Sequence, residues 1–193
     1  MNLPNKLTMV RVALVPVFMF FYMASFVPYG KAIALAVFAI AAFTDFLDGR
    51  IARKRNLVTN FGVFFDTLAD KLLVLGALVL VCLDGTVPFI MGAIVLMCIV
   101  GRDLVIMGLK SIAASAGIVI SADKLGKYKA FVIDIALVLL IILAFISGEG
   151  FIAGTALLVC QIVCWSILCI GALMSIISCI NYMVKNKEVF KDR

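Results

Sequence analysis

The stretch FTDFLDGRIARKRNLVTNFGVFFDTLADKL, residues 43–72, places four aspartates between two strongly apolar runs. Asp45 and Asp48 are three residues apart, and Asp66 and Asp70 are four residues apart. On α-helices both spacings bring the two carboxylates of a pair onto one face. Carboxylates at membrane depth are energetically costly and usually mark function, so this stretch indicates where the chemistry of the chain is expected.

The rest of the chain has the composition of an integral membrane protein. Of its 193 residues, 65% are hydrophobic and only 15% are charged, and the mean hydropathy is +1.24. A soluble domain cannot bury so large an apolar fraction. We expect a single membrane domain over residues 1–193, without a cleavable signal peptide, because the first apolar run contains Arg11 and lacks a small-residue cleavage site.

Six apolar runs are long enough to be considered as membrane spans, since a span needs about 20 residues. The predicted spans are Met9–Tyr29, Ala32–Leu47, Phe61–Leu83, Val87–Met107, Ala130–Ile146 and Ile152–Val184. The predicted fold is therefore all-α, a polytopic membrane protein with six transmembrane helices.

The basic residues predict the orientation of these helices. With the N-terminus in the cytoplasm, all of the 17 Lys and Arg residues except Lys31 lie on or near the cytoplasmic side. This bias predicts that both termini are cytoplasmic. The resulting basic face suits anionic headgroups and phosphates, whereas nucleic acid is a poor partner because the charges lie between spans.

The two aspartate pairs are expected at the same depth. Thirteen apolar-run residues, 32–44, precede Asp45, and thirteen residues, 71–83, follow Asp70. At the rise of an α-helix, both pairs then lie about 20 Å from the outer boundary of the membrane. Four carboxylates at one level repel each other, and two divalent cations would neutralise them. The chain has no histidine, and oxygen ligands alone favour Mg²⁺ or Mn²⁺.

The alternative is a set of structural salt bridges with neighbouring basic side chains. The available partners are Arg50, Arg53, Lys54, Arg55 and Lys71. The matching depth of four carboxylates favours a functional site instead, since intramembrane acids usually mark function. The surrounding residues narrow the chemistry: Gly49 and Gly62 leave space beside the aspartates, and Arg53 carries a guanidinium suited to phosphate. Metal ions, an arginine and small residues together predict a site for a bridging phosphate or diphosphate. A divalent-cation transporter is a different use of the same carboxylates, although only Asp84 continues an acidic path outward.

The segments DFLDGRIAR and GVFFDTLAD, eight residues apart, resemble the signature of the CDP-alcohol phosphatidyltransferases, D-x2-D-G-x2-A-R-x8-G-x3-D-x3-D. All fixed positions of that signature are present: Asp45, Asp48, Gly49, Ala52, Arg53, Gly62, Asp66 and Asp70. The resemblance implies an enzyme that displaces CMP from a CDP-lipid by the hydroxyl of an acceptor alcohol. It also implies that the four aspartates hold the two cations and that Asp70 is a candidate base for the acceptor hydroxyl.

Other segments are similar to the bacterial branch of this family that uses sn-glycerol 3-phosphate as the acceptor. These segments are NLPNKLTMVRVALVPVF near the N-terminus, DKLLVLGALVLV after the signature, and ISADKLGKYKA at 120–130. The implied reaction transfers the phosphatidyl group from CDP-diacylglycerol to sn-glycerol 3-phosphate and gives phosphatidylglycerol phosphate and CMP. Val63, Thr67 and the GRD sequence at 101–103 depart from the usual pattern, so inositol phosphate or serine is the alternative acceptor. A silent relative that only binds the CDP-lipid is disfavoured by the intact Asp70.

Candidate residues can be named for both substrates. For CDP-diacylglycerol the resemblance implies Asn5, Thr8, Gly49, Arg53, Thr59 and Gly62. Helix capping is the alternative for Asn5 and Thr8. The acceptor carries its own phosphate and needs a separate basic pocket. The candidates on the cytoplasmic side are Arg102, Lys124, Lys127 and Lys129, of which Arg102 and Lys127 are favoured, and plain positive-inside topology is the alternative for each.

Several further expectations concern single residues and assembly. Asp103 and Asp123 are expected to pair with nearby bases, and Asp134 should face protein or water. Tyr182 either reaches the acceptor pocket or belongs to the interfacial aromatic belt, and the belt is the preferred interpretation. The six cysteines all fall in apolar runs and are interpreted as inert core thiols. By resemblance we expect a homodimer in the cytoplasmic (inner) membrane of a bacterial cell, with the active site facing the cytoplasm.

Overall fold

The computed structural model describes residues 3–55, 60–115 and 124–187. Within these ranges the side chains are described except at 3–5, 45–55, 60–64, 66, 114–115 and 124–127. All regular structure in the described ranges is helical, which confirms the all-α prediction. The helices are α1 (Leu3–Met23), α2 (Gly30–Arg55), α3 (Asn60–Leu83), α4 (Phe89–Ser115), α5 (Lys124–Gly148) and α6 (Gly154–Lys185).

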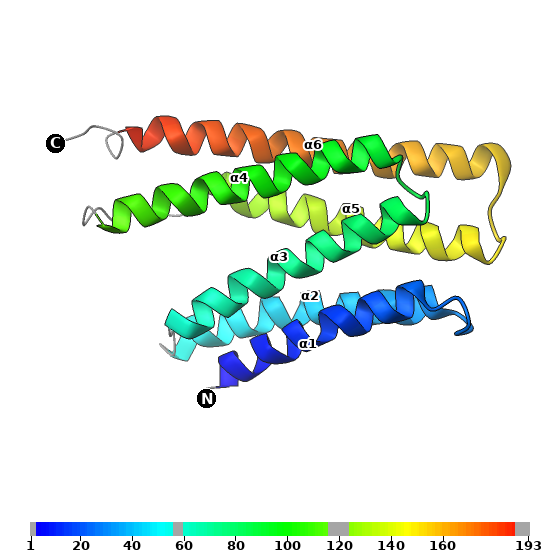
Figure 1. Ribbon diagram of the computed structural model, residues 1–193, viewed down its shortest axis with the longest axis horizontal. Coiled ribbons are helices and arrows are strands. Elements are labelled where there is room, and N and C mark those ends of the chain that lie inside the picture. Colours follow the sequence, from blue (N-terminus) through cyan, green and yellow to red (C-terminus); the bar gives the residue numbers. More distant parts are fainter. Residues whose placement is uncertain (1–2, 56–59, 116–123, 188–193) are drawn as a thin grey trace.

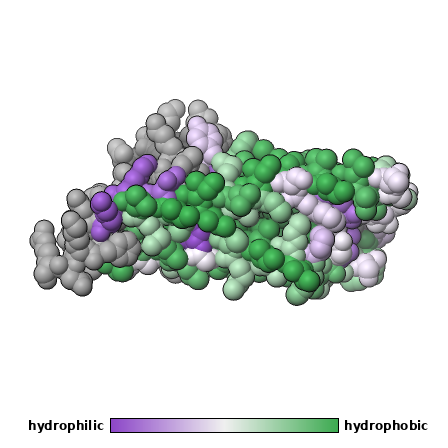
Figure 2. Space-filling view, turned by 90° about the horizontal axis from the view of Figure 1, so that it is seen from above, coloured by the Kyte–Doolittle hydropathy of each residue, from purple (hydrophilic) through white to green (hydrophobic). Residues whose placement is uncertain are grey.

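Four stretches in the described residues are long and apolar enough to cross a membrane. They are Lys6–Met23, Phe89–Ala113, Tyr128–Gly148 and Gly154–Lys185, and α2 adds the shorter apolar stretch Gly30–Thr44. The chain is therefore a multi-pass membrane protein. Figure 2 shows the matching surface, with apolar side chains over most of the length and hydrophilic side chains gathered toward one end. A soluble monomer rarely exposes so continuous an apolar surface.

Two helices extend well beyond the predicted apolar runs. α4 continues to Ser115, past the predicted end at Met107, and α5 begins at Lys124, before the predicted start at Ala130. Hydropathy marks where the apolar residues stop, whereas the helix continues as long as its backbone hydrogen bonds can form. The added helical segments carry Lys110 in α4 and Lys127 and Lys129 in α5.

The helices form one elongated bundle in which both ends of the chain lie at the same end (Figure 1). α1 packs against α2 and α3, α5 packs against α6 and α2, and α4 packs against α6. The same end of the bundle carries the last turns of α2 and α4 and the first turns of α3 and α5. The short connections 24–29, 84–88 and 149–153 lie at the opposite end. This arrangement brings most basic residues to one end of the bundle.

The core between the helices is built from fully buried aliphatic and aromatic side chains. Phe18 of α1 packs on Phe38 of α2 with ring centroids 5.5 Å apart, and Leu137, Leu140 and Leu168 are among the side chains with no exposed surface. Gly171 allows close approach of α6 to α5, because a Cβ there would lie only 2.8 Å from Cγ1 of Ile133. Small residues at such contacts are typical of helix packing in membranes.

Tyr182 does not belong to an exposed aromatic belt, so that interpretation is wrong. It is 4% exposed and packs with Ile106 and Leu109 of α4 and with Cys179. The run of apolar residues at the end of α6 gave no sign that this face turns toward α4, since burial there depends on the neighbouring helix. The six cysteines are all unpaired thiols, and Cys164 lies in the main core, as expected.

A network of hydrogen bonds around Asp84 lies at the end of the bundle opposite the termini. Asp84 accepts hydrogen bonds from the Tyr22 hydroxyl at 2.5 Å, from Lys31 Nζ at 3.0 Å and from the Thr86 backbone N–H at 3.0 Å. Lys31 also donates to the Ala144 carbonyl oxygen at 3.2 Å, and the indole N–H of Trp165 donates to the Thr86 carbonyl oxygen at 2.9 Å. These contacts satisfy polar groups at that end and link α1, α2, α5 and α6 to the connection that follows α3.

Candidate active site

The four signature aspartates lie on two helices that contact each other, α2 and α3. Asp45 lies ten residues before the end of α2 at Arg55, and Asp70 lies ten residues after the start of α3 at Asn60. Both pairs are on continuous helical backbone, so each pair shares a helix face as the spacing predicts. The equal distances from the α2–α3 connection agree with the expectation that the two pairs lie at one level.

Asp70 is the signature aspartate whose side chain the structure describes. Its carboxylate is half-exposed, at 47%, and the Nζ of Lys71 lies 3.9 Å from it. The side chains of Asp45, Asp48 and Asp66 lie outside the described residues. The described side chains contain no group of three or more potential metal ligands, and three of the four side chains of the predicted cation site lie outside them.

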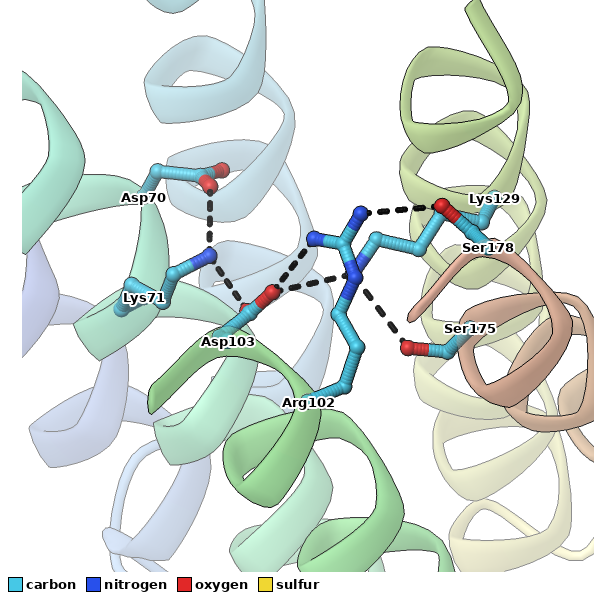
Figure 3. Close-up of polar contacts among 7 residues, drawn as sticks. All are labelled: Asp70, Lys71, Arg102, Asp103, Lys129, Ser175 and Ser178. Carbon is cyan, nitrogen blue, oxygen red and sulfur yellow. Dashed lines mark hydrogen bonds and ion pairs between the residues drawn. The ribbon is translucent and has the colours of Figure 1, made fainter. Parts of the chain in front are cut away.

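A second polar centre lies beside Asp70 and is built around Asp103 of α4 (Figure 3). The Asp103 carboxylate pairs with Nζ of Lys71 at 2.5 Å, with Nη1 of Arg102 at 2.7 Å and with Nζ of Lys129 at 3.1 Å. These three cations come from α3, α4 and α5, and the Asp103 side chain is only 8% exposed. The prediction that Asp103 pairs with nearby bases is confirmed, and we call Lys71, Arg102, Asp103 and Lys129 the cationic cluster.

Two serines of α6 complete the surroundings of the cationic cluster. Arg102 donates from Nη2 to the Ser178 hydroxyl at 3.1 Å, and Lys129 donates from Nζ to the Ser175 hydroxyl at 3.4 Å. Both serines are fully buried and lie one turn apart in α6. Hydrogen bonds to neutral hydroxyls orient the two cationic side chains without cancelling their charge.

The cationic cluster carries more positive than negative charge. Three cations surround one carboxylate, so the four side chains together have two positive charges in excess. Lys129 and Arg102 are largely buried, with side chains 6% and 13% exposed. Excess charge in a poorly hydrated site is unfavourable unless an anion accompanies it. A phosphate group has the charge and the acceptor oxygens to match, and an arginine can bind it with two parallel hydrogen bonds.

The structure describes two of the four predicted acceptor residues, Arg102 and Lys129, and brings them together around Asp103. Lys124 and Lys127 lie in the first turn of α5, but their side chains are outside the described residues. Sequence reasoning missed Lys71, Ser175 and Ser178 as members of this centre. For the serines the available signal was their one-turn spacing in an otherwise apolar helix, since polar side chains there need a partner.

The predicted CDP-diacylglycerol residues are only partly described. Thr8 is 3% exposed in α1, and Arg11 one turn later has no exposed surface. Because α1 already includes Leu3, Asn5 and Thr8 lie inside the helix, so the helix-capping alternative for them is wrong: a cap precedes the first helical residue. Gly49 and Arg53 lie in α2 and Gly62 lies in α3, while Thr59 falls outside the described residues.

Comparison with known proteins identifies the family. The sequence model of the CDP-alcohol phosphatidyltransferases matches residues 1–169. The chain belongs to the CDP-alcohol phosphatidyltransferase family, which confirms the resemblance seen in the signature.

Individual relatives narrow the comparison. The chain is 34% identical to the CDP-diacylglycerol–glycerol-3-phosphate 3-phosphatidyltransferase of Rickettsia bellii over 190 residues, which cover 98% of this chain and 97% of the relative. It is 39% identical to the protein of the same name from Bacillus subtilis over 139 residues, covering 66% and 70% of the two chains. A shorter match, 48% over 83 residues, links 42% of the chain to 25% of a rice cardiolipin synthase (CMP-forming).

Proposed function

We propose that this protein transfers the phosphatidyl group from CDP-diacylglycerol to sn-glycerol 3-phosphate, so that phosphatidylglycerol phosphate and CMP are formed. The observation that carries this proposal is the cationic cluster, which lies next to Asp70 and has two positive charges in excess. An acceptor whose phosphate binds this cluster would have its hydroxyl near Asp70, the candidate base. The relatives that match nearly the whole chain carry the name of this reaction.

The cationic cluster also bears on the choice between acceptors. Serine has no phosphate and would leave the excess charge of Arg102, Lys129 and Lys71 unmatched. Inositol phosphate has the phosphate but a larger ring, and the relatives compared at full length favour glycerol 3-phosphate. In this proposal Arg102 and Lys129 bind the acceptor phosphate, and Lys124 and Lys127 supply further charge from the first turn of α5.

Two divalent cations, Mg²⁺ or Mn²⁺, would be held by Asp45, Asp48, Asp66 and Asp70. The residues fit such ions, since the donor set is four carboxylates on contacting helices, with equal spacing from the α2–α3 connection and with Asp70 half-exposed. When bound, the cations supply Lewis-acid stabilisation of the negative charge on the diphosphate. The nucleotide and diphosphate of the donor would contact Asn5, Thr8, Gly49, Arg53, Thr59 and Gly62.

The protein's own side chains then perform the following chemistry. Asp70 accepts the proton of the acceptor hydroxyl while the hydroxyl oxygen forms a bond to the β-phosphorus of CDP-diacylglycerol. The bond between this phosphorus and the bridging oxygen breaks, and CMP leaves with the electron pair. Arg102 and Lys129 hold the acceptor phosphate in place, so the hydroxyl attacks from a bound position and not from solution. Arg53 lies on the same helix as Asp45 and Asp48 and would bind donor phosphate.

The arrangement of the helices supports a cytoplasmic active site. The end at which α1 begins and α6 ends also carries the helix segments with the four signature aspartates and most basic residues of the described ranges, and basic residues favour the cytoplasmic side. We therefore place six transmembrane helices in the cytoplasmic membrane of a bacterial cell, with both ends of the chain in the cytoplasm. Homodimer formation is part of the proposal by similarity to the family.

The test is release of CMP from CDP-diacylglycerol by the purified protein in detergent with Mg²⁺ or Mn²⁺. We expect CMP release with sn-glycerol 3-phosphate and little or none with serine, glycerol or inositol 1-phosphate. The Asp70→Asn variant provides the matched inactive control. Absence of acceptor-dependent CMP under every condition refutes the transferase, and a preference for inositol 1-phosphate or serine changes the acceptor.

A divalent-cation transporter is the alternative from another class. Such a path would need ligands toward the opposite end, where Asp84 was the candidate. In the structure Asp84 is engaged by Tyr22, Lys31 and the Thr86 backbone, as expected for a structural residue. Cation flux into liposomes containing the purified protein would be required to support the transporter.

A further inference from the structure

Lys71 lies between two carboxylates that differ in their exposure to solvent. Its Nζ is 2.5 Å from Oδ2 of Asp103 and 3.9 Å from Oδ2 of Asp70 (Figure 3). The first distance is a close ion pair, whereas the second is too long for a hydrogen bond. Lys71 therefore forms its close ion pair with Asp103 of α4 and not with Asp70, its neighbour in sequence.

The surroundings of Asp103 explain why it holds Lys71. The Asp103 side chain is 8% exposed and that of Asp70 is 47% exposed, so an ion pair with Asp103 is less screened by water. Arg102 and Lys129 also contact Asp103, and without its negative charge they would repel Lys71. The nearest carboxylate described for a displaced Lys71 is Asp70.

A lysine in close contact with Asp70 would oppose the role of that carboxylate. An ammonium group competes with a divalent cation for the same oxygen atoms, and its positive charge repels the cation. We propose that Asp103 is a positioning residue, which holds Lys71 away from Asp70 and so keeps the Lys71 ammonium from competing with the catalytic cations at that carboxylate. The role assigned to Asp70 rests on the proposed function, while the position of Lys71 follows from the contacts with Asp103.

The inference predicts a specific pattern of metal affinity. In the Asp103→Asn variant Lys71 moves toward Asp70, and Mn²⁺ binding weakens by about 10- to 100-fold, the range typical for loss of a residue that orients a metal ligand. In the double variant Asp103→Asn/Lys71→Met the competing ammonium is absent, so Mn²⁺ affinity returns to within about threefold of the wild type. The Lys71→Met variant alone binds Mn²⁺ as tightly as the wild type or more tightly, because it loses only a nearby positive charge.

The measurement is titration of the purified full-length protein with Mn²⁺, with free Mn²⁺ followed by electron paramagnetic resonance and no substrate present. Asp103→Glu, which retains the carboxylate, is the conservative variant and should bind Mn²⁺ within about threefold of the wild type. Asp84→Asn is the matched control, since it removes a carboxylate from a lysine at the opposite end of the bundle. Its Mn²⁺ affinity should be unchanged.

Each outcome decides the inference. Recovery of Mn²⁺ affinity in the double variant supports it, because loss of structure would not be repaired by removing a second side chain. Unchanged affinity in Asp103→Asn, or weak binding that Lys71→Met does not restore, overturns it. If Asp103→Asn does not fold, a tenfold or greater loss of affinity in Lys71→Met alone also overturns it, and unchanged or tighter binding there supports it. A wild-type protein that binds no Mn²⁺ overturns both this inference and the metal assignment of the proposed function, whereas failure confined to the variants leaves the proposed function standing.

Discussion

Lys129→Met tests the assignment of the cationic cluster to the acceptor phosphate. The substitution removes the ammonium group and keeps most of the side-chain volume within α5. Lys129 is suited to this test because its side chain is only 6% exposed and its partners, Asp103 at 3.1 Å and Ser175 at 3.4 Å, are known. Removing it leaves the cluster with one excess positive charge in place of two.

The magnitude follows from the burial of this lysine. A hydrogen bond to a charged group contributes about 1.5 to 3 kcal/mol. Since about 1.4 kcal/mol corresponds to a tenfold change in affinity, the KM for sn-glycerol 3-phosphate should rise by roughly 10- to 150-fold. The KM for CDP-diacylglycerol should stay within about twofold, because the donor binds at the aspartate pairs and not at the cluster.

The assay is CMP release in detergent, with the acceptor varied at saturating CDP-diacylglycerol and the donor varied at saturating acceptor. Lys31→Met is the matched control, because Lys31 also pairs with an aspartate, Asp84 at 3.0 Å, but lies at the opposite end of the bundle. Its two KM values should equal those of the wild type. An acceptor KM in Lys129→Met within about twofold of the wild type, with the protein folded, refutes the assignment of Lys129 to the acceptor phosphate.

Three further outcomes are expected. Asp70→Asn should lower the rate of CMP release by about 100- to 10,000-fold, the usual contribution of a general base. Unchanged size-exclusion elution in detergent would show that the variant is folded. Near-normal turnover would exclude Asp70 as the base. Ser178→Ala removes the hydroxyl that accepts from Arg102 at 3.1 Å, so the acceptor KM should rise about two- to tenfold, and an unchanged value would make Ser178 a packing residue only. Asp84→Asn should lower the free energy of unfolding by about 1 to 3 kcal/mol, since Tyr22 and Lys31 lose their shared acceptor; thermal unfolding in detergent measures this, and an unaltered midpoint would contradict a stabilising role.

Much of the fold was predictable because apolar runs of spanning length leave few alternatives to helices in a membrane. The six predicted runs each correspond to one of the six helices in the described residues. The helix ends were less predictable: α4 continues to Ser115 and α5 begins at Lys124, several residues beyond the predicted runs. Tyr182 was misinterpreted for a related reason, since its burial depends on α4 and not on its own helix.

The candidate site also contains features that the sequence predicts and features that depend on tertiary packing. The spacing of Asp45, Asp48, Asp66 and Asp70 places each pair on one helix face, and this is local information that a sequence contains. Arg102 and Lys129 were selected as acceptor residues only from their charge and their place in the chain. The sequence predicted that Asp103 pairs with nearby bases, and its contact with Arg102 joins two neighbouring residues of α4. Its contact with Lys129 of α5 depends on how the helices are arranged in the bundle, which local sequence does not determine.

Composition, the periodicity of one signature and the distribution of basic residues were thus sufficient to predict a polytopic helical protein, the carboxylate pairs and the class of reaction. Only the packing of α3, α4, α5 and α6 decided that Lys71 and Lys129 join Arg102 at one buried carboxylate and that Ser175 and Ser178 orient Lys129 and Arg102. The physical reason is the range of the interactions. Helix formation and membrane partition act between near neighbours in the chain, whereas an ion pair forms wherever tertiary packing brings two charges within about 4 Å.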